Sequence, residues 1–422
     1  MGEKKLAVLA FSGGLDTSFC VPWLIDRGYD VVTLFVDTGG VGDDGAATIA
    51  ARARELGAVE HVAVDVSAKL WDSFVVPFVM GGVKYQDRYP LLCSDRYLIV
   101  EETVKLAHAR GADVIAHGCT AMGNDQVRFD QTIGSLTGLP IVAPIREIQG
   151  VTSTPRVYEM EELKGRGFSV GEDVKRYTIN ENMLGVTISG SEIDDMGTPG
   201  AGTYRITRAP GERASGTERI AVGFERGVPV SIDGVALDGP AILSALAGRL
   251  GAYGVGRGIY AGDTIVGLKG RIVFESPGLE GLLVAHKALE ELTLTRAQNG
   301  FKPSAAGRWT ELVFGGAWCE PLREDLERFV RSTQQGVTGE VVLEVSAGSV
   351  AAVEVKTPNA LVREGAVYAQ SADWSAADAA GFIKISGQSM TLGAAQRRRV
   401  AGLAAGVGAG LASEDAAMAG GV

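Results

Sequence analysis

Serine, glycine, aspartate and threonine follow one another between two apolar stretches near the start of the chain. Ala10 to Ser18 reads AFSGGLDTS and lies between Leu6–Leu9 and Phe19–Ile25. This order predicts a strand, a loop and the N-terminus of a helix. Glycines let such a loop approach a ligand closely, and hydroxyl groups and first-turn N–H groups bind phosphate. The segment therefore favours a phosphate-binding loop.

The absence of a Gly-Lys pair limits the possible kinds of phosphate-binding loop. No Gly-Lys pair occurs in the 422 residues, which excludes the P-loop NTPases, because their loop requires Gly-Lys followed by Ser or Thr. Asp16 stands where that lysine would be, and a carboxylate beside phosphates is unfavourable unless a cation lies between them. We expect Mg²⁺ near Asp16, bound directly or through water. In the alternative, Ser12 and Asp16 only cap the helix and the glycines make a turn.

A second polar segment, HGCTAMGNDQVRFD, begins at His117, directly after the predicted strand Ala112–Ala116. Ligands on open parallel sheets bind at the carboxyl ends of the strands, so this segment and the Ser12 loop should face one cleft. We expect Asn124 to cap a helix, with Arg128 on the same face available to bind a carboxylate. The alternative is a capped helix with an exposed Asp125–Arg128 ion pair and a structural histidine.

Two further segments allow more than one interpretation. GVKYQDRYPLLCSDRY, from Gly82 to Tyr97, places aromatic hydroxyls, Ser94 and arginines in a turn-like stretch, which suits recognition of a polar small molecule or the packing of a surface loop. Gly40 to Gly45 matches the GxGxxG pattern of dinucleotide-dependent oxidoreductases. Asp43 and Asp44 would lie where a pyrophosphate must bind, so we interpret this stretch as a connection in which one of them caps the next helix.

The order of the predicted elements indicates the fold class. Strands alternate with helices up to about residue 170, which predicts a doubly wound parallel α/β sheet, and an α+β region follows. We expect a nucleotide-binding domain over residues 1–170, a second domain over 171–385 and a low-complexity tail over 386–422 that forms at most a frayed helix. Strand Leu139–Ile145, helix Arg308–Val313 and a long surface loop over residues 194–217 are among the predicted elements.

Composition bounds the partners and the compartment. The net charge of −11 argues against a nucleic-acid-binding surface, and no apolar run approaches the ~20 residues of a membrane span. The apolar run at the start leads into the phosphate loop, so we interpret it as a strand rather than a signal peptide. The four cysteines have neither CxxC nor metal-ligand spacing and are expected to be reduced thiols. We expect a cytoplasmic protein that binds neither nucleic acid nor membrane.

The motifs resemble one family. SGGLDTS is similar to the pyrophosphatase loop of the N-type ATP pyrophosphatases and, in its spelling, to the argininosuccinate synthase family. GNDQVRF, at Gly123–Phe129, and Asp87-Arg88-Tyr89 with Ser94 resemble two more segments of that family, and weaker similarities run to about residue 390. The resemblance implies an adenine nucleotide alpha hydrolase-like first domain, a synthetase and multimerisation domain after it, and a homotetramer.

The resemblance also implies ligands for individual residues. ATP would bind Ala10, Phe11, Ser12, Gly13, Gly14, Leu15, Asp16, Thr17, Ser18, Val36 and Gly118, with Mg²⁺ at Asp16. Aspartate would bind Thr120, Asn124 and Asp125. Citrulline would bind Tyr89, Ser94, Asn124, Arg128, Thr178 and Thr187. The catalytic residues would be Asp16, Asp125 and Arg128.

The implied reaction joins citrulline to aspartate. The ureido oxygen attacks the α-phosphate of ATP and releases pyrophosphate, and the aspartate amine then displaces AMP to give argininosuccinate. Two alternatives remain, namely another adenylating amidotransferase or ligase of the same superfamily, and a nucleotide-binding protein without catalysis.

The chain departs from the family pattern at several positions. It has Leu92-Cys93 for Gly-Thr, lacks the following Ala-Arg-Pro, and has Ala121-Met122 for Gly-Lys. Gly262 and Phe274 stand where the pattern has a citrulline-contacting Glu and Tyr. Either Asp263 and Tyr260 take over those contacts, or the acceptor differs from plain citrulline, for example as an acylated citrulline.

Overall fold

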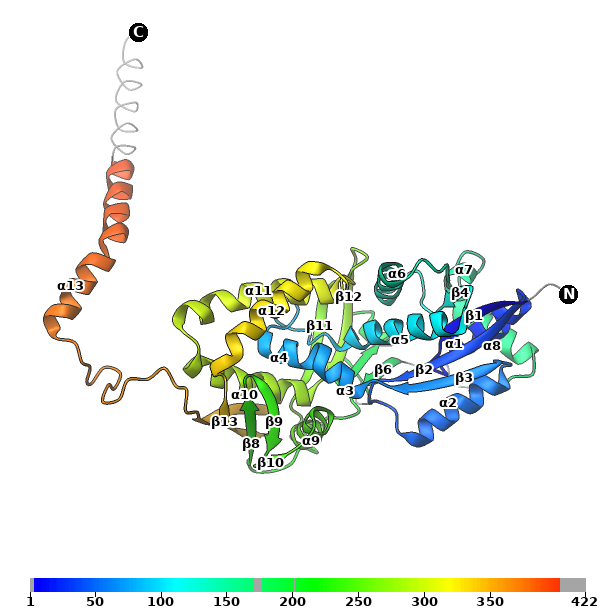
Figure 1. Ribbon diagram of the computed structural model, residues 1–422, viewed down its shortest axis with the longest axis horizontal. Coiled ribbons are helices and arrows are strands. Elements are labelled where there is room, and N and C mark those ends of the chain that lie inside the picture. Colours follow the sequence, from blue (N-terminus) through cyan, green and yellow to red (C-terminus); the bar gives the residue numbers. More distant parts are fainter. Residues whose placement is uncertain (1–3, 171–176, 201, 403–422) are drawn as a thin grey trace, which may run out of the picture. The chain divides into compact units, whose positions relative to one another are not determined.

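The computed structural model describes residues 4–170, 177–200 and 202–402. The chain divides into two units, one ending at Leu361 and the other beginning at Val362. In the first unit a parallel sheet forms from the N-terminal part of the chain, and two antiparallel sheets with their helices follow (Figure 1). None of the helices formed by the described residues combines the length and apolarity needed to cross a membrane.

The predicted parallel sheet is confirmed. Its five strands lie in the order β3-β2-β1-β4-β5, and every neighbouring pair is parallel. The elements of this region are β1 (Lys5–Ala10), α1 (Leu15–Asp26), β2 (Tyr29–Asp37), α2 (Asp43–Glu55), β3 (Glu60–Asp65), α3 (Ser67–Leu70), the π-helical turn η1 (Trp71–Val75), α4 (Val76–Gly81), the 3₁₀ turn η2 (Leu92–Ser94), α5 (Asp95–Arg110), β4 (Val114–Ala116), α6 (Asp125–Leu136), β5 (Ile141–Val142), α7 (Pro144–Ile148) and α8 (Pro155–Gly165).

Successive side chains of a strand point to opposite faces of the sheet, and helices cover both of these faces. Ala7 and Leu9 of β1 lie in a core that includes side chains of α1, α7 and α8. Val8 and Ala10 lie in a second core, formed with α5 and α6. The strand order reverses between β1 and β4, and ligands of doubly wound sheets bind outside the carboxyl ends of the strands at such a point.

The remaining part of the first unit is α+β, as predicted. Its elements are β6 (Thr178–Asn182), β7 (Gly185–Ser189), the 3₁₀ turn η3 (Ser191–Ile193), β8 (Glu218–Glu225), β9 (Val228–Ile232), β10 (Val235–Ala236), α9 (Gly239–Ala252), β11 (Arg257–Asp263), β12 (Lys269–Glu275), α10 (Pro277–Thr293), α11 (Arg296–Phe314), α12 (Pro321–Ser332), the 3₁₀ turn η4 (Thr333–Gly336), β13 (Gly339–Ser346) and β14 (Ser349–Lys356).

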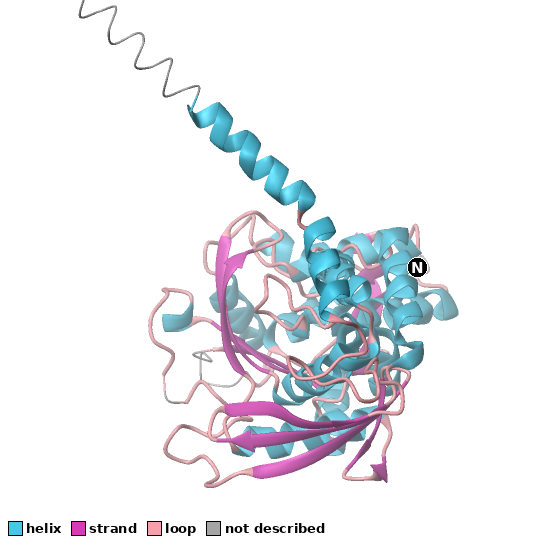
Figure 2. Cartoon of the chain, turned by 90° about the vertical axis from the view of Figure 1, so that its left-hand side faces the viewer, coloured by secondary structure: helices cyan, strands magenta, loops and turns pink. Residues whose placement is uncertain are grey.

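The strands of this part form two antiparallel sheets, seen as magenta arrows in Figure 2. One has the order β10-β9-β8-β13-β14 and the other β11-β12-β7-β6. β8 and β9 form an antiparallel hairpin, and β13 and β14 form a second antiparallel pair. Apolar side chains of α9, α10 and the first of these sheets share one core with α4 and with the segment that precedes α5.

Three sequence predictions about single elements are wrong in detail. The predicted strand Leu139–Ile145 is reduced to Ile141–Val142 because Pro144 begins α7. The predicted helix Arg308–Val313 is only the last third of α11, which begins at a capping box on Thr295. Gly42, rather than Asp43 or Asp44, occupies the N-cap of α2, so the aspartates already lie within the helix.

Residues 194–200 and 202–217 form a long loop, as predicted, but part of it is held in the interior. Glu275, which is fully buried, accepts hydrogen bonds from the backbone N–H groups of Arg205 at 2.7 Å and Thr207 at 2.9 Å. Arg257 donates to the Thr207 hydroxyl at 2.6 Å and to its carbonyl at 2.6 Å. The interpretation as a purely surface loop is therefore wrong for this segment, since a buried carboxylate fixes its backbone.

The second unit contains α13 (Ala376–Ser386), which begins at a capping box formed by Ser375 and Asp378. None of the residues of α13 is buried. Residues 388–402 are also helical, which is more regular structure than the frayed helix that we expected. Residues 403–422 of the predicted tail lie outside the described residues.

Candidate active site

The segment after β1 has the geometry of a tight loop that leads into a helix. Gly13 has φ +74, a left-handed conformation that favours glycine, and a Cβ atom there would lie 3.1 Å from Cγ1 of Ile49. α1 begins at Leu15, and no side chain caps its N-terminus. Its first-turn N–H groups thus remain available at the positive end of the helix dipole, where an anion binds favourably.

Two hydroxyl groups of this loop lie together. The oxygens of Ser12 and Thr17 are 3.2 Å apart, and the backbone N–H of Gly14 donates to Ser12 Oγ at 3.4 Å. Ser18 is buried and donates to the Gly13 carbonyl at 3.3 Å, so its hydroxyl supports the loop from the inside. Other residues predicted to bind the nucleotide are also buried, and they contribute shape rather than exposed side chains: Ala10, Phe11 and Val36.

Asp16, in the first turn of α1, faces a second carboxyl group that the sequence analysis did not identify. Glu159, on α8, is 1% exposed, and its Oε2 atom has no hydrogen-bond partner among the described residues. Burial, reinforced by the charge of Asp16, raises the pKa of Glu159 well above its ordinary value. Glu159 therefore retains its proton at neutral pH. Nothing in the sequence around Glu159 indicates that its carboxyl group lies near Asp16.

The Ser12 loop and the His117 segment meet at the carboxyl ends of the neighbouring strands β1 and β4. β1 and β4 are neighbours in parallel register, with Leu9 opposite Ala116. A Cβ atom on Gly118, two residues beyond β4, would lie 3.1 Å from Cγ2 of Thr17. The Ser12 loop and the His117 segment are thus in contact, and the shared cleft that we expected between them stays a prediction.

His117 fixes the turn that carries Gly118. Its Nδ1 accepts the backbone N–H of Cys119 at 3.2 Å, and its Nε2 lies 2.8 Å from Asp130 Oδ1. These partners require a neutral ring that carries its proton on Nε2. Arg146 donates to both oxygens of Asp130, at 2.8 and 3.0 Å. The arrangement matches the alternative of a structural histidine.

The helix α6 presents its predicted residues differently from the expectation. Asn124 occupies the N-cap position, but its side chain caps no N–H group of α6. Its Oδ1 instead accepts the backbone N–H of Ile265 at 2.9 Å. Arg128 is 3% exposed and donates to the Phe314 carbonyl through Nε at 3.2 Å and Nη2 at 2.9 Å. Both contacts join α6 to segments from the α+β part of the unit.

Asp125 lies between two arginines. Its Oδ1 accepts from Arg128 Nη1 at 2.8 Å, and its Oδ2 accepts from Arg96 Nε at 3.2 Å. Burial alone would raise the pKa of Asp125, but the two guanidinium groups outweigh burial and hold that pKa below its ordinary value. The predicted i, i+3 pair of Asp125 and Arg128 exists, but it is not the exposed pair of the alternative interpretation.

Some of the residues predicted to bind citrulline are buried, and others are exposed. Tyr89 is buried, and burial raises the pKa of its hydroxyl, while the charge of Arg128 and the side chain of Thr187 partly offset that effect. Ser94 is fully buried and donates to the Leu91 carbonyl at 2.8 Å. Thr178 is exposed on β6, opposite Ser189 rather than Thr187. Thr120 lies near Gly123 in the turn before α6.

The position of Gly262 has no space for a side chain. A Cβ atom there would lie 2.6 Å from the Tyr260 hydroxyl and 2.7 Å from Gln86 Oε1. Tyr260 donates to Gln86 Oε1 at 3.0 Å or to the Asp263 carbonyl at 2.9 Å, and Gln86 donates to Asp263 Oδ2 at 2.9 Å. Phe274 packs edge-on against Tyr89, with ring centroids 5.7 Å apart. Aromatic and amide side chains thus fill the space around both departures from the pattern.

Two family models match successive parts of the chain. Residues 6–161 match the model of the arginosuccinate synthase N-terminal HUP domain, and residues 177–392 match that of the arginosuccinate synthase C-terminal domain. The chain belongs to the argininosuccinate synthase family. It is therefore a ligase, and membership supports the ligation of citrulline and aspartate in arginine biosynthesis.

Curated relatives match over nearly their full length. The argininosuccinate synthase of Xanthomonas campestris pv. campestris is 54% identical over 92% of this chain and 98% of its own length. The argininosuccinate synthases of Methanocaldococcus jannaschii and Bacillus subtilis are each 36% identical, over 94% and 92% of this chain and 100% and 96% of their own lengths. Among solved structures, a 4-thiouridine synthetase–RNA complex with bound ATP matches 38% of this chain and 40% of its own at 20% identity, with a TM-score of 0.29, too loose a similarity to carry an argument.

Proposed function

We propose that the chain makes argininosuccinate from citrulline, aspartate and ATP through a citrullyl-AMP intermediate, with AMP and pyrophosphate as products. The observation that supports this proposal most directly is the contact of Gly118 with Thr17, which joins the phosphate loop to the segment that carries Asn124, Asp125 and Arg128. A nucleotide held by the loop would then have its α-phosphate next to residues suited to amino-acid substrates.

In the first half-reaction the ureido oxygen of citrulline attacks the α-phosphorus of ATP. A bond from this oxygen to phosphorus forms, and the bond to the β-phosphate oxygen breaks, so pyrophosphate leaves with the electron pair. The hydroxyls of Ser12 and Thr17 and the first-turn N–H groups of α1 hold the β- and γ-phosphates and stabilise the charge that develops on them. We assign the nucleotide to Ala10–Ser18, Val36 and Gly118.

In the second half-reaction the amine of aspartate attacks the ureido carbon. A carbon–nitrogen bond forms, the bond from carbon to the ureido oxygen breaks, and AMP leaves with that oxygen and the electron pair. Two of the three protons of the aspartate ammonium pass to solvent and one stays on the new guanidinium nitrogen. Asp125 is ionised because Arg96 and Arg128 lower its pKa, so it serves as a hydrogen-bond acceptor that orients the amine rather than as a strong base. We assign aspartate to Thr120, Asn124 and Asp125, and citrulline to Tyr89, Ser94, Asn124, Arg128, Thr178 and Thr187.

Mg²⁺ fits this site only together with the nucleotide. The described residues contain no group of three or more His, Cys, Asp or Glu side chains that could hold a metal ion. Asp16 offers one carboxylate beside the phosphate loop, and a magnesium ion usually combines one or two carboxylates with phosphates and water. The ion would neutralise phosphate charge, and Asp16 would hold it directly or through water.

The proposal is tested with purified protein, ATP, Mg²⁺, citrulline and aspartate. We expect sustained formation of AMP and pyrophosphate only when both amino acids are present. ADP formation, or nucleotide binding without turnover, would contradict the proposal in favour of another chemistry or a non-catalytic protein. Turnover with ammonia in place of aspartate would favour a sibling amidotransferase. Activity with an acylated citrulline but not with citrulline would identify the acceptor.

We further propose that residues 1–170 act as the nucleotide-binding domain and residues 171–385 as the synthetase domain. We also propose that the protein is a homotetramer. The second unit supports an oligomer because its helix α13 buries none of its own apolar residues, among them Phe382, Ile383 and Ile385. Exposed apolar surface of this kind marks interfaces. Light scattering of the full chain should give four copies, and F382S/I385S should reduce that number. A monomeric parent protein would contradict the assignment.

A further inference from the structure

Arg96 is a charged residue of the site that the proposed reaction uses only to keep Asp125 ionised. It lies in the first turn of α5, and its side chain is 12% exposed. Its Nη1 donates to Asp95 Oδ1 at 2.6 Å, and its Nε donates to Asp125 Oδ2 at 3.2 Å. Its Nη2 has no hydrogen-bond partner in residues 4–170, 177–200 and 202–402. The guanidinium is thus fixed on two sides and keeps one donor group for a ligand.

The other arginine of the cluster is less available. Arg128 uses Nε and Nη2 on the Phe314 carbonyl and Nη1 on Asp125, and it is 3% exposed. Arg96 and Arg128 contact different oxygens of Asp125, so the three charged groups form a row. Of the two guanidinium groups, that of Arg96 keeps a nitrogen, Nη2, that makes no hydrogen bond among the described residues.

The contact between Arg96 and Asp125 matches the charges of an amino acid. An α-amino acid carries an ammonium and a carboxylate on one carbon, and here a carboxylate and a guanidinium lie 3.2 Å apart. A planar guanidinium binds a carboxylate with defined geometry, and the adjacent carboxylate accepts from the amine. We propose that Arg96 binds a carboxylate of the amino donor, aspartate, while Asp125 orients its amine. This assignment rests on the proposed function.

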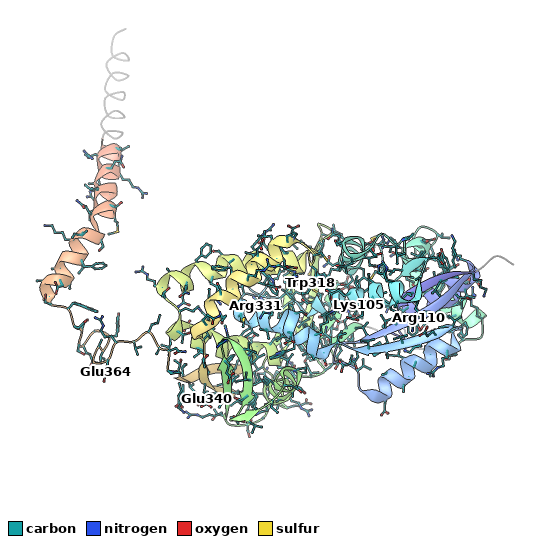
Figure 3. All side chains as sticks on the ribbon, viewed as in Figure 1. Lys105, Arg110, Trp318, Arg331, Glu340 and Glu364 are labelled. Atoms are coloured by element: carbon teal, nitrogen blue, oxygen red, sulfur yellow. The ribbon has the colours of Figure 1, made fainter. Side chains whose placement is uncertain are left out.

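The surroundings of Arg96 hold it in position. Tyr97, the next residue, stacks on Trp318 with ring centroids 4.7 Å apart, and Trp318 Nε1 donates to Glu101 Oε1 at 2.9 Å. Trp318, labelled in Figure 3, thus ties the first turns of α5 to the segment between α11 and α12. A guanidinium fixed before the substrate arrives loses little entropy on binding it. The fixed position therefore favours Arg96 as a binding residue.

The test compares R96Q and R96K with K105Q. Lys105 lies on the same helix, is exposed and pairs with Glu102 at 2.7 Å, so K105Q removes one positive charge from α5 away from the site (Figure 3). We expect R96Q to raise the KM for aspartate by ~10- to 100-fold, since hydrogen bonds to charged groups are of that strength. The KM values for citrulline and ATP should stay within about threefold. R96K should recover part of the loss, because lysine supplies the charge without the fork.

A second measurement separates binding from folding and from the first half-reaction. Citrulline-dependent exchange of pyrophosphate into ATP needs no aspartate, so R96Q should retain it at the level of K105Q. Inhibition by succinate, which has both carboxylates of aspartate but no amine, should weaken in R96Q. An unchanged KM for aspartate, or an equal rise in all three KM values, would overturn the role of Arg96. Absence of any turnover in the parent protein would instead refute the proposed function.

Discussion

The backbone of Gly118 lies against the side chain of Thr17, so closely that a Cβ atom on Gly118 would come within 3.1 Å of Thr17 Cγ2. Gly118 follows β4 and Thr17 lies in the first turn of α1. The contact therefore lies at the point where the strand order of the parallel sheet reverses. The nucleotide is proposed to bind at this point.

G118V should raise the KM for ATP at least ~10-fold, because the branched side chain must displace Thr17 and distort the phosphate loop. The KM for citrulline should change much less. Steady-state kinetics with each substrate varied in turn measures both values. Gly134, on α6, has no atom within 4 Å of an added Cβ, so G134A is the matched control and should behave as the parent protein. Parent-like ATP kinetics in G118V would show that this contact does not shape the nucleotide site.

Arg128 should matter for the acceptor more than for ATP. R128A should raise the KM for citrulline by ~10- to 100-fold and leave that for ATP within about threefold, given the strength of charged hydrogen bonds. Arg128 also holds the Phe314 carbonyl, so R128A should unfold more readily than the parent protein. R128K, which retains the charge, controls for the loss of packing. Equal effects on the two KM values would contradict the assignment of Arg128 to citrulline.

A buried ion pair joins α4 to α10 and α11. Lys302 Nζ lies 2.7 Å from both oxygens of Glu290 and 2.5 Å from the Met80 carbonyl, and both side chains are almost completely buried. K302M should reduce the free energy of unfolding by ~3 to 5 kcal/mol, because Glu290 would be left as an unpaired buried charge.

Chemical denaturation measures this change, and two variants frame it. Lys287 and Glu291 form an exposed pair at 3.7 Å on α10, so K287M should cost at most ~1 kcal/mol. The double variant K302M/E290L removes both buried charges and should recover most of the lost stability. If K302M were as mild as K287M, the buried pair would not be a structural tie.

His286 should make stability depend on pH. It is 1% exposed, and burial lowers its pKa to about 4 from an ordinary value near 6.5. The unfolded chain then binds a proton between these values while the folded chain does not, so the stability present above pH 6.5 is lost as the pH falls towards 4. The loss from this group is about 3 kcal/mol.

H286Q should flatten that part of the profile of unfolding free energy against pH, measured by urea denaturation from pH 4 to 7.5. Gln334 Oε1 accepts from His286 Nε2 at 2.9 Å, and glutamine can keep that bond. H108Q, at the C-terminal end of α5, serves as the matched histidine control and should follow the parent profile. Parallel profiles for H286Q and the parent protein would refute the role of His286.

Local patterns in the sequence predicted the parts of the structure that depend on local chemistry. Alternation of apolar runs with helices predicted the parallel sheet, and the Gly13 bend with its hydroxyls predicted the loop before α1. The short β5 and the long α11 were missed, because Pro144 ends one pattern early and Pro303 interrupts the other without ending the helix. The predictions are thus correct where the residues that determine a structure are neighbours in the chain.

Side-chain partners that are distant in sequence could not be predicted. Nothing near Asn124 indicates that its side chain binds the backbone of Ile265, and nothing near Asp16 indicates Glu159. Arg96 was visible as an arginine in a polar segment, but its contact with Asp125 depends on the packing of α5 against α6. Tertiary structure decides these contacts, so the site residues named from motifs required the structure to show their actual partners.

Transfer of an oxygen isotope reveals whether a ureido oxygen attacks the α-phosphate of ATP. Citrulline labelled with ¹⁸O in its ureido group is incubated with the protein, ATP, Mg²⁺ and aspartate, and the nucleotide product is analysed by mass spectrometry. We expect one ¹⁸O atom in the phosphate of each AMP formed. Unlabelled AMP, or label in inorganic phosphate with ADP as the nucleotide product, would refute this attack.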